Sequence, residues 1–173
     1  MNESDRQRDL RYLAEGRDAL LDSVRGLSEA DAAVRPAPGR WSVLECIEHV
    51  CNVEDRMLGA LETRLPLADL PGPREREESV IRFVTARQEK MAAPARVLPT
   101  GRFSTLAQAI EHFSAVRART IAFIEICDRD LRMYRAKHPV LGEITGEELL
   151  LVLALHPARH AGQIRETREA LKV

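Results

Sequence analysis

Residues 145–171, TGEELLLVLALHPARHAGQIRETREAL, decide the fold that the sequence predicts. Thr145 and Glu148 have the spacing of a helix capping box, in which each side chain bonds the other residue's backbone N–H. Behind them, one stripe repeats at intervals of three and four residues, which is the period of a helix with one buried face. The stripe consists of Leu149, Leu153, His156, His160, Ile164, Thr167 and Leu171. The pattern predicts a helix that continues to about Lys172.

The same periodicity predicts four further helices. Their expected ranges are Ser4–Arg25, Ser42–Leu65, Arg74–Met91 and Ser104–Arg129. No segment alternates convincingly with period two, so we expect no strand and interpret residues 138–146, HPVLGEITG, as a turn. Four long helices and one extra short helix, joined by long loops, predict an all-α four-helix bundle with crossover connections. We expect a single domain over residues 1–173.

Local signals support the helix starts. Ser4 with Gln7, and Ser42 with Glu45, repeat the capping-box spacing. Three of the predicted apolar stripes each contain one polar interruption. These interruptions are Arg17, Glu54 and Arg117.

The composition excludes several classes of protein. The chain has 173 residues, 45% apolar and 31% charged, with a formal net charge of −1, so it has no basic excess to neutralise nucleic-acid phosphates. The charged N-terminus has no apolar core of a secretory signal, and the longest apolar run, residues 149–155, is too short to cross a bilayer. Three cysteines without a CxxC pair are typical of reduced thiols. We therefore expect a cytoplasmic protein with neither nucleic acid nor membrane as partner.

His156 and His160 stand on the inner stripe in place of apolar residues. Four residues apart on a helix, their imidazoles lie one above the other and can chelate one metal ion. The alternative is a pair of core histidines that bond backbone groups or water. Two stacked imidazoles in an interior are difficult to satisfy without a shared partner, which favours the metal.

A third ligand is needed for a site with three protein ligands. His49 is the candidate, although periodicity places it at the edge of its helix's apolar arc and predicts half exposure. Cys46, one turn earlier, is either a fourth ligand or, as we prefer, a buried thiol. We interpret His112 as exposed and His138, which precedes a proline, as structural or solvated.

Two stretches carry a resemblance to a known family. The stretch RWSVLECIEHVCNVEDRM, residues 40–57, is similar to the second helix of the DinB/YfiT-like family, in which a ligand histidine lies seven residues after the Ser of a Trp-Ser start. HPVLGEITGEELLLVLALHPARHAGQI, residues 138–164, is similar to its last helix, where HPxxG and HxxxHxxQI recur. The resemblance implies an unusual helix order and one divalent ion held by His49, His156 and His160. Gln163 belongs to the same motif, either beside the ligands or in helix packing.

Pro157, between the two late histidines, departs from an ideal helix. Its ring should clash with the carbonyl of Leu153, so we expect a kink or a loosened turn that weakens the site. A homodimer is a further expectation, formed through the apolar face of the short helix at Val80, Ile81 and Val84.

The resemblance also implies a reaction. Relatives with known activity are similar to thiol transferases or isomerases that use low-molecular-weight thiols such as bacillithiol, mycothiol or glutathione. The first hypothesis is transfer of such a thiol to an electrophilic small molecule, with Zn, Ni or Fe not distinguished by imidazole ligands. Glu45 and Glu54 are weak candidates for a general base. The alternatives are a metal-dependent hydrolase and a non-catalytic, stress-associated metal-binding protein.

Overall fold

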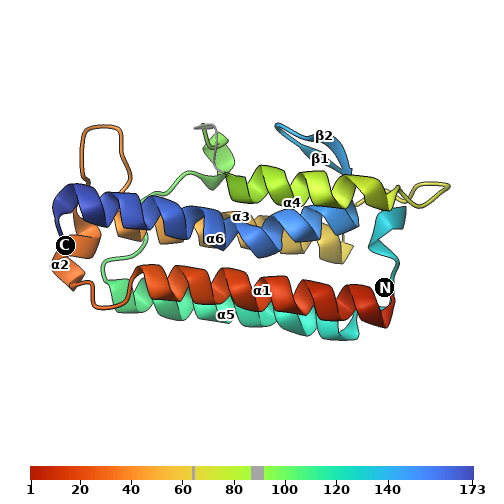
Figure 1. The fold of residues 1–173 in the computed structure, drawn as a ribbon, viewed down its shortest axis with the longest axis horizontal. Helices are drawn as coiled ribbons and strands as arrows, with labels where there is room; N and C mark the ends of the chain where they lie inside the picture. The colour runs from red at the N-terminus through yellow and green to blue at the C-terminus, as the bar shows by residue number, and fades with distance from the viewer. Residues whose placement is uncertain (64, 87–91) are drawn as a thin grey trace.

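The structure, a computed structural model, describes residues 1–63, 65–86 and 92–173 and contains a bundle of long helices (Figure 1). The long helices are α1 (Glu3–Ser23), α3 (Val43–Thr63), α5 (Leu106–Ile126) and α6 (Gly146–Leu171). α6 packs against α1 and α3, and α5 packs against the same two helices, so α1 and α3 face each other across a diagonal. Figure 1 shows α1 and α6 running in one direction and α3 and α5 in the other. This arrangement confirms the four-helix bundle with crossover connections.

Shorter elements connect and cover the bundle. They are α2 (Glu29–Ala33), α4 (Glu77–Ala86), the 3₁₀ turns Arg74–Arg76, Ala95–Val97 and Leu131–Met133, and the strands β1 (Arg135–His138) and β2 (Gly142–Thr145). α4 is the extra short helix, and it packs along α6 (Figure 1). The predicted range Arg74–Met91 is confirmed as helical through Ala86, and its last residues, 87–91, lie outside the described residues.

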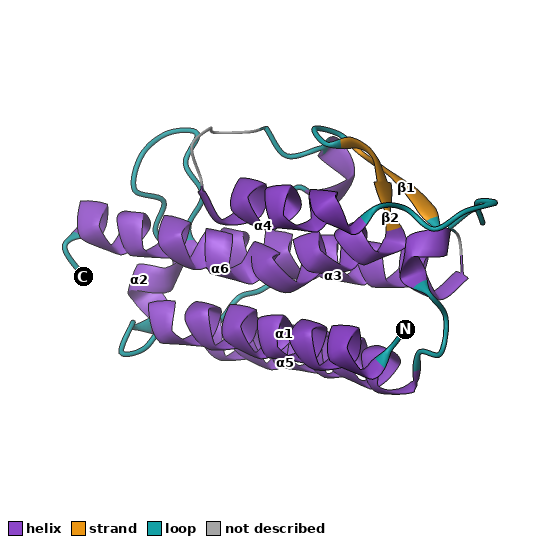
Figure 2. Ribbon diagram, turned by 45° about the vertical axis from the view of Figure 1, so that its right-hand side comes forward, coloured by secondary structure: helices purple, strands orange, loops and turns teal. Residues whose placement is uncertain are grey.

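The strands correct the prediction that residues 138–146 form only a turn. β1 and β2 pair antiparallel as a hairpin beside α4 (Figure 2). Each strand has four residues, which is too few for alternation to be recognised in the sequence. Ala136 and Ile144 are cross-strand partners and are both buried, so the hairpin covers one end of the core.

Two of the three predicted capping boxes are confirmed. Thr145 and Glu148 exchange both hydrogen bonds at the start of α6, and Ser42 and Glu45 do so at the start of α3. The box at Ser4 is wrong, because Asn2 caps α1 by accepting from the backbone N–H of Asp5.

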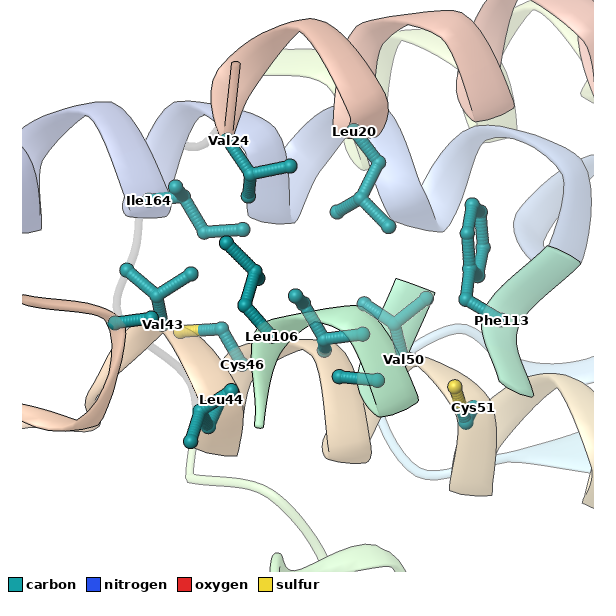
Figure 3. Packing of buried hydrophobic residues seen from close by; sticks show 13 residues of the cluster. Leu20, Val24, Val43, Leu44, Cys46, Val50, Cys51, Leu106, Phe113 and Ile164 are labelled. Atoms are coloured by element: carbon teal, nitrogen blue, oxygen red, sulfur yellow. The ribbon is translucent and has the colours of Figure 1, made fainter. Parts of the chain in front are cut away.

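The four long helices share an apolar core, part of which Figure 3 shows. Side chains from all four helices converge there, and each large one contributes about 1.5–3 kcal/mol on burial. They include Leu20, Val24, Val50, Leu106, Phe113 and Ile164. In the part of the chain that the structure describes, no helix is long and apolar enough to cross a membrane.

A separate cluster joins α4 to α6. Val80 and Val84 are 2% and 3% exposed, and they pack with Leu151, Val152 and Leu155 of α6. Two of the three residues expected to form a dimer surface are therefore covered within the chain. The homodimer itself stays a prediction.

Candidate metal centre

The three predicted histidines lie together between α3 and α6. The ring centroids of His156 and His160 are 4.4 Å apart, and the ring of His49 lies 4.8 Å from that of His160 and 5.2 Å from that of His156. One nitrogen from each ring can be chosen so that all three lie within 4.8 Å of one another. Two helices far apart in the sequence thus bring three imidazole nitrogens to one point.

His49 is more buried than its helix position predicts. Its exposed fraction is 5%, because a loop from another part of the chain covers this edge of α3. Val97, at the end of the 3₁₀ turn Ala95–Val97, accepts a hydrogen bond from His49 Nδ1 at 2.8 Å. The Trp41 ring lies 4.8 Å away, between centroids. The prediction of half exposure is therefore wrong.

Hydrogen bonds fix which nitrogen of two histidines is available. A carbonyl oxygen only accepts, so His49 must carry its hydrogen on Nδ1 toward Val97. His160 Nδ1 donates in the same way to Gln163 Oε1 at 3.0 Å. Both tautomers leave the Nε2 lone pair unprotonated, which is the usual arrangement of metal-ligating histidines. Gln163 therefore takes the first of its two predicted roles.

His156 faces His160 through Nε2. The two Nε2 atoms are 3.2 Å apart. This distance agrees with tetrahedral zinc, because two nitrogens bound to one such ion at ~2.0–2.1 Å lie about 3.3 Å apart. His156 Nδ1 is buried without a hydrogen-bond partner among the described residues. The donor set and its spacing fit a divalent ion.

The environment also favours the neutral imidazoles that bind metals. Burial lowers the pKa of His49, although the bond to Val97 opposes that shift. Burial lowers the pKa of His156 well below its usual value, and repulsion between protonated forms of His156 and its neighbours His160 and His49 adds to the effect. At neutral pH these rings need not lose a proton before they bind an ion.

Pro157 does not separate the two late histidines. α6 continues from Gly146 to Leu171 with Pro157 inside it, and the Nε2 atoms of His156 and His160 remain 3.2 Å apart. α1 approaches this turn so closely that a Cβ added to Gly16 would collide with the carbonyl oxygen of Ala154. The proline therefore leaves the two imidazoles within chelating distance, and its effect on the strength of the site stays a prediction.

Glu48 anchors the loop that covers His49. Its carboxylate accepts from Thr100 N at 2.7 Å, Thr100 Oγ1 at 2.8 Å, and the N–H groups of Gly101 and Arg102 at 3.0 Å. Burial raises the pKa of Glu48, but these bonds outweigh it and the pKa is lowered. Sequence reasoning missed Glu48, because its partners, three backbone N–H groups and the Thr100 hydroxyl, belong to a distant loop and leave no pattern near it.

The histidines line one wall of a cavity of about 880 Å³. The cavity lies between α3, α6, the β-hairpin and residues 92–98, and Trp41, Met57, Phe83 and Val152 contribute apolar walls. His138 also lines it, with Nδ1 accepting from the N–H groups of Val140 and Leu141. The structural interpretation of His138 agrees with these bonds, but its place in the cavity was not predicted.

The remaining predicted site residues lie elsewhere. Glu45 pairs with Arg35 and caps α3, and Glu54 pairs with Arg117 in the core. Neither carboxylate is among the described residues that line the cavity, so the structure gives the general-base prediction no support. Cys46 is buried in the apolar cluster, as the preferred interpretation expected.

His112 was predicted to be exposed, and the structure partly corrects this. Its side chain is 38% exposed, and Nε2 lies 3.9 Å from Asp55 Oδ2. It belongs to α5 and is not among the residues that line the cavity.

Comparisons with known proteins agree with the fold. The chain is 24% identical over 159 residues to the uncharacterized protein YuaE of Bacillus subtilis (strain 168), covering 91% of this chain and 96% of that protein. Two solved structures are similar. A conserved protein of Enterococcus faecalis has a TM-score of 0.66 and 16% identity, over 99% of this chain and 98% of that one. YfiT from Bacillus subtilis, described as a probable metal-dependent hydrolase with an unusual four-helix bundle topology, has a TM-score of 0.59 and 17% identity, over 99% and 90%. A sequence model of the DinB superfamily matches residues 12–164, and the chain belongs to that superfamily.

Proposed function

We propose that this protein is a divalent-metal-dependent enzyme that transfers a low-molecular-weight thiol to an electrophilic small molecule. The observation that carries the proposal is the set of three imidazoles, His49, His156 and His160, at the wall of a large cavity. His49 and His160 present Nε2, because Val97 and Gln163 hold their Nδ1 hydrogens.

In this proposal the histidines and the cavity walls have separate roles. The three histidines would hold the ion through neutral nitrogens, and a divalent ion held this way supplies a Lewis acid that lowers the pKa of a ligated thiol or water. The cavity would hold both substrates and exclude water from the apolar wall at Met57 and Val152. In the overall reaction the thiol releases its proton to solvent, its sulfur forms a bond to the electrophilic carbon, and the bond from that carbon to the leaving group breaks with its electron pair departing on the leaving group.

A thiol nucleophile is compatible with a cavity that neither predicted general base lines. An ordinary thiol has a pKa near ~8.5, below the ~15.7 of bulk water, and a divalent ion lowers the pKa of whichever of the two it ligates. Glu45 and Glu54 are both bonded elsewhere and do not line the cavity. The hydrolase remains the second candidate, because the similar structure of YfiT is described as a probable metal-dependent hydrolase.

The first test is the metal content of protein purified without an affinity tag. We expect about one divalent ion per chain, lost in His160→Ala and retained in His112→Ala. His112 is the matched control, because it lies outside the cavity. No stoichiometric metal, together with an unchanged melting temperature and activity in His160→Ala, would overturn both enzyme proposals and leave a non-catalytic protein.

The second test separates the two reactions. A panel of small thiols is incubated with a generic electrophile, and product is measured with and without thiol. Thiol-dependent product that disappears in His160→Ala supports the transferase. Steady hydrolysis of an ester or amide without thiol overturns it in favour of the hydrolase.

A further inference from the structure

The described lining of the cavity has a charge opposite to that of the whole chain. Among the described residues that line it, basic ones outnumber acidic ones, although the chain carries a formal net charge of −1. The basic residues are Arg40, Arg56, Arg96, Arg135, Lys137 and Arg159, and the acidic ones are Glu143 and Glu166. Charges of one sign around a concave, low-dielectric wall concentrate ligands of the opposite sign.

Several of these cations already have partners. Arg40 lies 3.8 Å from Glu166, and Arg135 donates to the carbonyl groups of Arg132, Tyr134 and Leu70. Arg159 donates to Val84 O at 3.4 Å. These three side chains are held mainly by the protein.

Arg56 and Arg96 differ from them. Both are exposed, and neither has an ion pair or a side-chain hydrogen bond among the described residues. Arg56 lies seven residues after His49 on α3, which puts it on the same face about 10 Å along the helix axis. Arg96 directly precedes Val97, whose carbonyl holds His49. The two guanidinium groups therefore come from the same two segments that position the first histidine.

We propose that this cavity selects ligands with a carboxylate or phosphate group, which Arg56 and Arg96 bind while the reacting end lies at the histidines. The inference deepens the proposed function and rests on it for the position of the reacting end. Guanidinium groups suit such anions because their N–H donors match two oxygens at once. Because both arginines are exposed, we expect a selectivity of roughly tenfold in Kd rather than a large one.

The experiment compares two thiols of similar size. Cobalt-loaded protein is titrated with 3-mercaptopropionate, which carries a carboxylate, and with 3-mercaptopropanol, which is neutral. The Kd of each is read from the thiolate-to-cobalt absorption band. We expect tighter binding of the anion, by roughly tenfold, and a preference that falls as salt is raised.

A double variant locates the preference. Arg56→Gln with Arg96→Gln should bring the two Kd values to within about twofold of each other. Arg165→Gln is the control, because Arg165 is exposed on α6 and does not line the cavity. Equal Kd values in the unchanged protein, or the same loss in Arg165→Gln, would overturn the proposal.

A metal-free arm separates this inference from the proposed function. Trp41 is the single tryptophan and lines the cavity, so its fluorescence reports ligands there. Metal-free protein is titrated with butyrate, butyl phosphate and butanol. Tighter binding of either anion supports the anion site even when no thiol binds cobalt. Failure of every thiol to bind cobalt would count against the thiol transferase alone. Binding of all three with equal Kd overturns the anion site whatever the metal does.

Discussion

Glu54 Oε2 lies 2.8 Å from Arg117 Nη2, in the core between α3 and α5. Their side chains are 2% and 1% exposed, and Thr120 Oγ1 also donates to Glu54 at 2.8 Å. Each residue of the pair is the polar interruption in an otherwise apolar stripe. Two irregularities in the sequence, 63 residues apart, are therefore one interaction.

This pair predicts a large loss of stability when one partner is removed. Glu54→Ala leaves the Arg117 charge buried without its partner, which should cost about 3–5 kcal/mol in urea denaturation. Replacing both, as Glu54→Leu with Arg117→Met, should recover most of that loss, because no charge is then buried. Unchanged stability with lost activity in Glu54→Ala would instead revive Glu54 as a general base.

Glu48 should control metal affinity without touching the metal. In Glu48→Gln an amide NH2 group, which only donates, replaces one carboxylate oxygen, so the N–H groups of Gly101 and Arg102 lose their acceptor if it replaces Oε2, and the loop that presents Val97 to His49 loosens. We expect roughly 10–100-fold weaker zinc binding in competition with a chelator. Glu62→Gln, exposed on the same helix, is the control. Lower stability with unchanged zinc affinity would show that Glu48 acts only in folding.

Gly16 should tolerate no side chain. A methyl group there meets the carbonyl oxygen of Ala154, so α1 and α6 must separate, and Gly16→Ala should lower the free energy of unfolding by about 1–3 kcal/mol. Gly59→Ala on α3 has open space and should raise it by up to ~1 kcal/mol, as alanine favours helix. Thermal unfolding of both variants checks the pair. A Gly16→Ala protein as stable as Gly59→Ala would contradict the close approach.

Glu147 should make stability depend on pH. Burial, the nearby Asp9 charge and their mutual hydrogen bond raise the pKa of Glu147 from 4.5 to about 8, although Arg8 opposes this. The folded state therefore keeps a proton that the unfolded state releases above 4.5. The resulting loss of stability grows through this window and is complete above about 8.

Glu147→Gln tests this directly. The amide can still accept from Arg8 and donate to Asp9, so the variant should be about 1–3 kcal/mol more stable at pH 8.5 and nearly equal at pH 4.5. Urea denaturation at several pH values measures the difference. Glu169→Gln, exposed near the end of α6, should show no such trend. A parallel pH profile for Glu147→Gln and the unchanged protein would refute the raised pKa.

The sequence by itself determined the long helices and two of the three candidate metal ligands. Periodicity and capping depend on neighbours three and four residues away, so α6, its start at Thr145 and the shared face of His156 and His160 could be predicted. The hairpin of β1 and β2 could not be predicted, because each strand has too few residues to show the two-residue periodicity of a strand.

The tertiary structure decided the rest. His49 is buried where Val97, 48 residues later, folds over it, and Glu48 holds that loop mainly through backbone N–H groups, which have no sequence signature. The partner of Glu54 and the contact between Gly16 and Ala154 likewise depend on how helices pack. Local interactions fix which face a residue takes on its helix. Chain segments distant in sequence determine whether that face contacts water, a carbonyl group or another helix.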